Sequence, residues 1–250
     1  MYSICKNTVS FAEILIMKVS CKVSVCLACY NGENYIEEQL NSILVQLAPN
    51  DEVIISDDCS TDNTFQIVKG IKDSRITLVQ NKNGKGVIQN FENALSKASG
   101  DIVFLADQDD IWHEDKVSTI LDYFKENKAI TCVFSNALII DKEGVSTNTL
   151  FFPSTPKIDL FNLFIKNKFL GCTMAFRANN QLRILPFSKN LPMHDWFIGL
   201  RHVLKGKVAF INENLIYYRR HGQNVTTGKS ANLMTILKWR FIMLKSLVKF

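Results

Sequence analysis

Blocks of apolar and polar residues alternate along the first part of the chain. Four short apolar runs have the length and composition of buried strands: Val23–Cys29, 53–55, 76–79 and 102–105. Between these runs, apolar residues recur at helical spacing, as they do over 35–47, which predicts amphipathic helices. Strands that alternate with helices in this way predict a parallel sheet with helices on both faces.

The second half of the chain shows a less regular pattern. We expect helices over 115–127 and 196–204, a hairpin turn at 141–144, and strands over 131–140, 171–176, 208–210 and 215–218. No internal repeat and no low-complexity linker interrupts the sequence. The prediction is therefore an α/β fold, a Rossmann-like and mostly parallel sheet flanked by helices, with an extension on its C-terminal side.

The two ends of the chain differ from the predicted domain. The apolar stretch 11–17 is short and contains Glu13, so it is a poor signal peptide. Residues 1–18 are expected to lie outside the core, and Met17 is an alternative start of translation. No run of about 18 uncharged apolar residues occurs, so no transmembrane helix is predicted. The domain is expected over 19–226, followed by a basic amphipathic helix over 227–250.

The C-terminal stretch 233–250 has two interpretations. It combines apolar residues with four cations and no acidic residue; the cations are Lys238, Arg240, Lys245 and Lys249. A basic amphipathic helix can lie in the interface of a membrane. A helix that packs its apolar side on the domain explains the same pattern, and both interpretations stay open.

Composition limits the class of protein only broadly. The chain has 250 residues, of which 47% are hydrophobic and 21% are charged, as is typical of a globular protein. The net charge of +5 is too small to indicate binding of nucleic acid. Cys26 and Cys29 form a C-x-x-C pair, but no second pair stands at zinc spacing. Positions i and i+3 of a strand also point to opposite faces, which favours buried, reduced thiols over a metal or redox site.

Acidic residues follow the second and fourth predicted strands. In sheets of this kind, ligands bind beyond the carboxyl ends of the strands. Asp107, Asp109 and Asp110 place three carboxylates within four residues. A divalent cation that prefers carboxylate oxygens, Mg²⁺ or Mn²⁺, would relieve their repulsion. A helix N-terminus explains one such residue but explains the full cluster poorly.

Two other acidic positions have both a chemical and a structural interpretation. Asp57 and Asp58 stand at a strand end, where a carboxylate can accept hydrogen bonds from a base or a ribose, while the next residues cap a helix. Asp195 stands between His194 and Trp196, where an aromatic wall could limit hydration and tune its pKa. A helix cap is the alternative for Asp195.

Two common nucleotide-binding loops are missing from the sequence. Gly84-Lys85-Gly86 has Gln89 where G-x-G-x-x-G needs a third glycine, and it follows the third strand, which argues against a dehydrogenase. The pattern G-x-x-x-x-G-K-[ST] does not occur, which argues against a P-loop enzyme.

Taken together, the motifs resemble those of family 2 glycosyltransferases with the GT-A fold. The resemblance covers about residues 22–226 and depends on six segments in order: 24–32, 56–64, Asn83-Gly84, Asp107-Gln108-Asp109-Asp110, His194-Asp195-Trp196 and Tyr218-Arg219-Arg220-His221. The form Asp-Gln-Asp-Asp-Ile-Trp is most similar to bacterial transferases that build surface polysaccharides such as O-antigen, rhamnosyltransferases among them. The C-terminal extension would then lie on the acceptor side.

The resemblance implies how the donor is bound. Asp57 would meet the nucleobase with Tyr30 and Asn31 nearby, and Asp107 would face the ribose. The other positions expected to bind the nucleotide sugar are Asp58, Asn83, Gly84, Gln108 and Arg220.

The resemblance also implies the catalytic groups. Asp109 would bind the metal, Mn²⁺ or Mg²⁺, that bridges the diphosphate. His221 matches a histidine that reaches the metal or diphosphate in some members, although a surface histidine is its alternative. Asp195 matches the catalytic base. Inverting transfer needs such a base to take the acceptor proton while a diphosphate leaves from the opposite face.

The implied activity is metal-dependent transfer of a hexosyl or rhamnosyl group. The donor would be a UDP- or dTDP-sugar, and the acceptor a hydroxyl of a saccharide or lipid-linked saccharide. The expected location is the cytoplasm or the inner face of the cell membrane, reached through 233–250. A catalytically silent nucleotide-sugar-binding or membrane-docking subunit is the alternative, and a retaining transferase or a nucleotidyltransferase is a weaker one.

Overall fold

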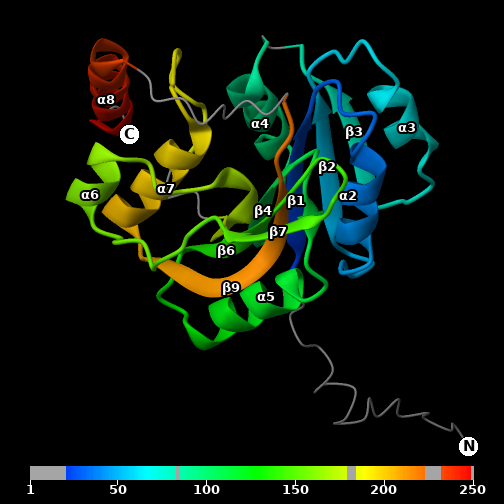
Figure 1. Ribbon diagram of the computed structural model, residues 1–250, viewed down its shortest axis with the longest axis horizontal. Coiled ribbons are helices and arrows are strands. Elements are labelled where there is room, and N and C mark those ends of the chain that lie inside the picture. Colours follow the sequence, from blue (N-terminus) through cyan, green and yellow to red (C-terminus); the bar gives the residue numbers. More distant parts are fainter. Residues whose placement is uncertain (1–20, 83–84, 179–183, 223–231, 249–250) are drawn as a thin grey trace, which may run out of the picture.

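The computed structural model describes residues 21–82, 85–178, 184–222 and 232–248. The expected N-terminal extension, 1–18, lies outside these residues, as do Asn83, Gly84 and the segment 227–231 of the predicted C-terminal helix. Among the described residues, one sheet runs through the molecule with helices on both sides (Figure 1).

Four parallel strands form the first half of the sheet. Their order is β3 (Ile76–Gln80), β2 (Glu52–Asp57), β1 (Val23–Cys29) and β4 (Ile102–Asp107). All seven residues of β1 are buried. A central strand covered on both faces needs apolar side chains in both directions, which explains the nearly continuous apolar run. The buried Ser24 interrupts it, and its hydroxyl is hydrogen-bonded to Glu52.

Three helices connect these strands: α2 (Ile36–Leu44), α3 (Thr64–Gly70) and α4 (Val87–Leu95). The buried face of α2 includes Leu40 and Ile43, in the helical spacing seen in the sequence. The helix α4 packs against β1 and β2. Gly86 precedes it with a φ of 112°, a conformation that glycine adopts without steric cost.

The second half of the sheet adds antiparallel pairs. Beyond β4 follow β8 (Met174–Arg177), β6 (Cys132–Ile140), β9 (Val208–Arg219) and β5 (Ile111–Trp112), and β7 (Ser146–Leu150) pairs with β6. The long ladder between β6 and β9 is parallel, so most paired positions in the described sheet are parallel. The predicted α/β fold with a mostly parallel sheet is confirmed, and the predicted hairpin turn joins β6 to β7.

Two predicted segments differ in detail. The strand predicted over 171–176 begins with a turn of 3₁₀ helix, Gly171–Thr173, and β8 starts only at Met174. The strands predicted at 208–210 and 215–218 are one strand, β9, because the exposed residues 212–214 remain beside β6 across a shift of register. Their polar side chains face solvent. In the sequence, three consecutive polar residues are typical of a loop, so the pattern predicts two strands.

Four further helices complete the described structure: α5 (Lys116–Glu126), α6 (Leu160–Ile165), α7 (His194–Lys205) and α8 (Leu233–Val248). The helix α7 contacts both α6 and α8. These three helices lie together at the left of Figure 1, at the end of the molecule opposite α2 and α3. No helix within the described ranges combines the length and the apolarity that a membrane span needs.

Candidate active site

The carboxyl ends of three neighbouring strands bring the first acidic positions together. In the parallel register, Asp57 of β2 lies opposite Cys29, and Asp107 of β4 lies opposite Ala28. The end of β1 therefore lies between the two aspartates. This edge is where ligands bind in parallel sheets flanked by helices.

Asp57 and Asp58 organise the loops at this edge. Asp57 is fully buried, and its Oδ2 accepts a 3.0 Å hydrogen bond from the Ser60 N–H. Asp58 accepts hydrogen bonds from the Asn81 side-chain amide at 2.8 Å and from the Gly86 N–H at 2.7 Å. Asp58 thus ties the segment before α4 to the end of β2, and this structural role accounts for its burial.

Tyr30, Asn31 and Gln108 form a hydrogen-bonded rim beside these aspartates. The Gln108 side chain accepts from the Tyr30 N–H at 2.7 Å and donates to the Tyr30 carbonyl at 3.0 Å. Asn31 has a φ of 49°, and its Oδ1 accepts from the Thr61 N–H at 2.8 Å. The Tyr30 side chain remains 52% exposed, so its ring offers a free face to a planar ligand.

A buried group of ionisable side chains lies next to Asp107. Ligand atoms of Asp107, Asp110 and Cys172 all lie within 4.8 Å of one another. The fully buried Lys116 donates from Nζ to the Cys172 carbonyl at 2.7 Å. Burial lowers the pKa of Lys116 to about 7, although the neighbouring acidic groups oppose this change. Burial also raises the pKa of Asp110 well above its usual range. Burial therefore disfavours the charged forms of both Lys116 and Asp110, while the charge of Lys116 partly opposes the rise in the pKa of Asp107.

Asp109 contacts the segment that follows β9. Its Oδ2 lies 2.7 Å from Nε2 of His221, and the two side chains are 14% and 8% exposed. The His221 ring stacks on Tyr35 with 5.0 Å between ring centroids. His221 is thus held between Asp109 and Tyr35, the residue before α2. It does not lie free on the surface, as the alternative interpretation expected.

Arg219 fixes the backbone of the acidic cluster. Its Nε donates to the Asp109 carbonyl at 2.8 Å, and its backbone N–H donates to Asp110 Oδ1 at 3.0 Å. Its guanidinium also forms a 2.6 Å ion pair with Glu38 of α2. Arg220, the arginine expected to bind the nucleotide sugar, is exposed. The two neighbouring arginines therefore differ: one is built into the site and the other faces solvent.

Asp195 lies in the first turn of α7. Its carboxylate accepts hydrogen bonds from the Asn167 side-chain amide at 3.2 Å and from the Trp196 N–H at 2.7 Å. Burial raises the pKa of Asp195 to about 6, although these hydrogen bonds oppose the rise. The neighbouring His194 stacks on Phe91 of α4 at 4.1 Å between centroids. This contact anchors the start of α7 to the first half of the sheet.

Asp107 links the groups from the two halves electrostatically. Burial raises its pKa to about 7, and the charges of Asp109 and Asp195 add to the rise. Both carboxylates therefore lie close enough for their charges to act on Asp107. Carboxylates from the end of β4, from the following loop and from α7 share one site.

The donor atoms beside Asp109 fit a divalent cation. A carboxylate oxygen suits Mn²⁺, and a neutral imidazole nitrogen is a common metal ligand; here the two atoms lie 2.7 Å apart. Nearby, Oδ2 of Asp110 is buried without a hydrogen-bond partner in the described ranges. Asp109 and His221 would hold the cation. Cys172 is a poorer ligand for it, since thiolates suit softer metals and burial keeps the pKa of this thiol well above its usual value.

The C-x-x-C pair takes no part in a metal group among the described residues. Cys26 is fully buried in the core. Cys29 lies 3.7 Å from an oxygen of Asp57, so its thiol supports the strand end. Burial raises the pKa of both thiols, in keeping with reduced cysteines that act as small apolar side chains.

Three residues that support the site were missed in the sequence: Phe91, Lys116 and Asn167. Lys116 shares the buried face of α5 with Ile120, four residues further on, and this spacing is a signal that sequence reading could have used. Asn167 lies in an irregular segment between α6 and Gly171, where no periodicity indicates which side chains point inward.

The sequence profile described as glycosyl transferase family 2 matches residues 24–181. The chain is 32% identical to the UDP-Glc:alpha-D-GlcNAc-diphosphoundecaprenol beta-1,3-glucosyltransferase WfaP of Escherichia coli, in a match that covers 85% of this chain and 82% of that protein. It is 28% identical to the dTDP-rhamnosyl transferase RfbG of Shigella flexneri, and that match covers 79% of this chain and 72% of RfbG.

A similar fold occurs in the crystal structure of S. aureus TarS 1–349 in complex with UDP-GlcNAc. The TM-score is 0.68 at 20% sequence identity, and the match covers 89% of this chain. The chain spans 66% of that TarS chain, slightly less than two thirds of its length. At this level of identity the likeness concerns the fold, and it confirms the expected GT-A arrangement.

Proposed function

The chain belongs to glycosyl transferase family 2, and from this membership we propose that it transfers a sugar, with inversion, from a UDP- or dTDP-linked donor to a lipid-linked saccharide. The two nucleotides are those in the names of WfaP and RfbG, and the lipid-linked acceptor class is the one in the name of WfaP. The product would be part of a bacterial surface polysaccharide.

One observation carries the proposal: the segment Gly171-Cys172 contacts both Asp195 and the acidic cluster. A Cβ at Gly171 would lie 3.5 Å from the Cβ of Asp195, and ligand atoms of Cys172 lie within 4.8 Å of those of Asp107 and Asp110. In a single displacement, the leaving diphosphate and the attacking hydroxyl approach opposite sides of one carbon atom. The groups that serve them must therefore be close neighbours. Asp109 is the candidate on the diphosphate side, and Asp195 is the candidate on the hydroxyl side.

The donor would bind along the ends of β1 and β2. The exposed ring of Tyr30 offers a stacking face for the base, and Gln108 holds the backbone of Tyr30 in place. Asp57 would accept a hydrogen bond from the base. Asp107, which is partly exposed, would accept one from the ribose. The exposed Arg220 would supply a cationic contact to phosphate.

Asp195 would take the proton from the acceptor hydroxyl. A pKa of about 6 makes it a stronger base than an ordinary aspartate, while it remains mainly ionised at neutral pH. Burial lowers the pKa of the adjacent His194 to about 3, so that imidazole is neutral and does not compete for the proton. Trp196, the next residue after Asp195, is buried and would limit the access of water to the Asp195 carboxylate.

A divalent cation bound by Asp109 and His221 would stabilise the negative charge of the departing nucleoside diphosphate. The chain's own contribution is to hold these two ligands. Tyr35 stacks on the His221 ring, and Arg219 fixes the Asp109 backbone. The Asp109 carboxylate suits both Mn²⁺ and Mg²⁺, whereas the imidazole of His221 favours Mn²⁺ over Mg²⁺, which prefers oxygen ligands.

A screen of nucleotide sugars for metal-dependent release of nucleoside diphosphate tests the proposal. In Asp109→Ala we expect the metal-dependent release to be lost. In Asp195→Asn we expect transfer to fall by about 10²–10⁴-fold, the usual contribution of a general base, while calorimetry still detects nucleotide binding. Asp122→Asn, on the exposed side of α5, is the matched control and should leave both properties unchanged. Full transfer activity in either site variant would refute the assigned roles.

The anomeric configuration of the product, read by NMR, separates inverting from retaining transfer. The catalytically silent subunit is not favoured, because the family model and the relatives that match this chain are those of transferases. Nucleotide binding without sugar transfer or donor hydrolysis, over a broad panel of donors and acceptors, would nevertheless establish the silent subunit.

A further inference from the structure

A row of exposed apolar side chains runs along α8. Its members are 49% to 78% exposed: Leu233, Met234, Leu237, Phe241, Leu244 and Val248. Successive residues of an α-helix are rotated by about 100° about its axis. On that basis the six side chains fall within an arc of about 100° on one side of the helix. Another side, with Met243 and Leu247, is buried against the domain. The helix therefore packs one face on the domain, as one interpretation of the sequence expected. Its other apolar face is exposed, as the membrane interpretation requires.

Cations border the exposed face on both sides. Lys238 and Lys245 follow the arc at one border, and Arg240 lies at the other. The helix contains no acidic residue. Lys238 and Lys245 are exposed, whereas Arg240 is half-buried and its Nε is covered. An apolar strip bordered by two exposed lysines complements a bilayer with anionic headgroups, since the apolar groups reach the acyl boundary while the lysines reach phosphates.

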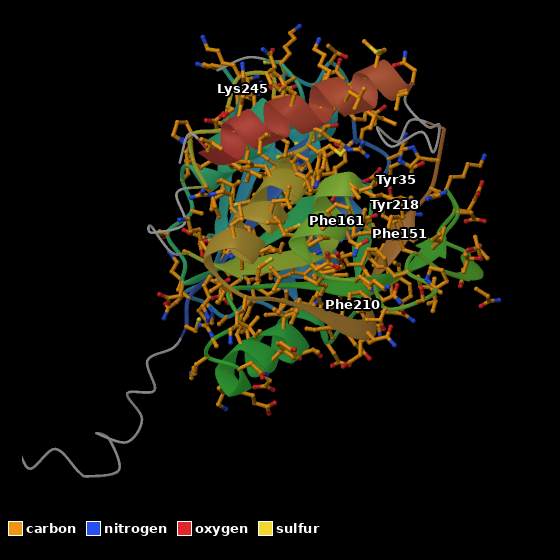
Figure 2. All side chains as sticks on the ribbon, turned by 90° about the vertical axis from the view of Figure 1, so that its left-hand side faces the viewer. Tyr35, Phe151, Phe161, Phe210, Tyr218 and Lys245 are labelled. Atoms are coloured by element: carbon orange, nitrogen blue, oxygen red, sulfur yellow. The ribbon has the colours of Figure 1, made fainter. Side chains whose placement is uncertain are left out.

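The short helix α6 extends this face. Leu160, Phe161 and Ile165 are 42%, 74% and 45% exposed. The Arg240 guanidinium donates to the Ile165 carbonyl, so the two helices are neighbours. Figure 2 looks onto this side of the molecule, with α8 running across it, Lys245 on that helix and Phe161 on α6 below it. These nine apolar residues, with the exposed Lys238 and Lys245, form the α6–α8 surface.

We propose that the α6–α8 surface docks on an anionic lipid bilayer, with α8 lying parallel to the membrane plane. The apolar residues extend over the full length of α8, as insertion of one helix face into a flat interface requires. The cations supply charge complementarity to acidic lipids, worth several-fold in affinity for each residue near the surface.

The α6–α8 surface adjoins the acceptor side of the site. Asn167, which donates to Asp195, follows α6 by two residues. The Trp196 indole N–H donates to the Leu163 carbonyl at 2.7 Å. A bilayer docked here would present a lipid-linked acceptor close to Asp195. This consequence rests on the proposed function, whereas the docking itself does not.

Vesicle co-sedimentation of the full chain tests the docking. Vesicles of phosphatidylcholine alone are compared with vesicles that also contain phosphatidylglycerol, at low and high salt. We expect binding mainly to the anionic vesicles, weakened by salt. Leu237→Ser/Phe241→Ser should lower the partition coefficient by about tenfold or more. Lys238→Glu/Lys245→Glu should lower it by at least about tenfold on anionic vesicles and remove the salt dependence.

Val45→Ser/Val145→Ser is the matched control, since both valines are exposed, at 80% and 62%, and belong to other elements. It should bind vesicles as the unmodified chain does. Thermal unfolding checks that each variant is folded. Equal vesicle binding by all variants, or no binding by the unmodified chain, would overturn the proposal. Dimerisation seen by light scattering and abolished by Leu237→Ser/Phe241→Ser, without vesicle binding, would overturn it too and assign the surface to a contact between copies.

Release of nucleoside diphosphate from the donor separates this proposal from the proposed function. The variants in α8 should retain that release, because none of their residues contacts the site. Vesicle binding without any donor turnover would leave the docking intact and remove the proposed function. Donor turnover without vesicle binding would leave the proposed function intact and remove the docking.

Discussion

At the residue scale, the surroundings of each carboxylate determine what it can do. Asp58 accepts two hydrogen bonds from neighbouring chain and is committed to structure. Asp110 is fully buried, beside Lys116 and Arg219. Asp195 is only partly buried and has a pKa of about 6. A group that exchanges a proton near neutral pH is suited to general base catalysis. Asp107 also has a raised pKa, of about 7, but it lies at the end of β4 on the proposed ribose side, so Asp195 is the carboxylate matched to that task on the acceptor side.

The pH dependence of kcat/KM should therefore show an acid limb near pH 6. Asp195 must be ionised to accept a proton, and its raised pKa keeps it protonated below about 6. We expect the rate to rise with pH through this value and to level off above it. In Asp195→Asn the limb should disappear together with most of the rate.

Asn167→Leu is an informative companion variant. The Asn167 hydrogen bond favours the charged form of Asp195 and opposes the effect of burial. Its removal should move the acid limb to higher pH. An unchanged limb in this variant would mean that another group controls the profile.

At the element scale, α7 depends on close packing to place Asp195. Gly199 lies in this helix against the ring of Phe169, and a Cβ at Gly199 would overlap that ring. Gly70, at the end of α3, has open space around the position of a Cβ. The two glycines are thus a matched pair, one in a closed contact and one in solvent.

Gly199→Ala should lower the free energy of unfolding by about 1–3 kcal/mol, because an extra methyl group in a packed contact displaces its neighbours. Gly70→Ala should change it by less. Chemical denaturation measures both. In the double variant Gly199→Ala/Phe169→Leu, part of the loss should be recovered, since the smaller side chain makes room. Strict additivity of the two single changes would contradict the assigned contact.

At the scale of the whole molecule, the site joins parts of the chain that are distant in sequence. Arg219 at the end of β9 forms an ion pair with Glu38 of α2, and His194 of α7 stacks on Phe91 of α4. A ligand that bridges the two halves should therefore stabilise the folded chain as a unit, by mass action.

UDP and Mn²⁺ together should raise the Tm, because bound metal and diphosphate share the Asp109 side of the site. At a ligand concentration of about 100 Kd, the stabilisation is about 2.7 kcal/mol. That corresponds to a shift of about 5–10 °C for a domain of this size. Scanning calorimetry with UDP alone, Mn²⁺ alone and both measures it. In Asp109→Ala the additional effect of the metal should vanish, and its persistence would place the cation elsewhere.

Local patterns predicted the first half of the fold because each strand and helix there carries its own periodicity. The apolar run of β1 and the spacing of α2 were sufficient to place those elements. The continuity of β9 was not predictable, since residues 212–214 are polar and the register against β6 shifts between Ile211 and Asn214, while pairing with β6 on both sides keeps the segment in one strand. The short strand β5 exists for the same reason, because it pairs with β9.

The sequence by itself determined the α/β fold, the family and the acidic motifs at the strand ends, because these properties depend on neighbouring residues and on regular spacing. Only the tertiary structure decided that Lys116 is buried beside the acidic cluster, that Arg219 rather than Arg220 is hydrogen-bonded to the site, and that one apolar face of α8 is left uncovered. These outcomes depend on burial and on contacts between segments far apart in the chain. Such contacts set the pKa values and exposed surfaces that no local pattern records.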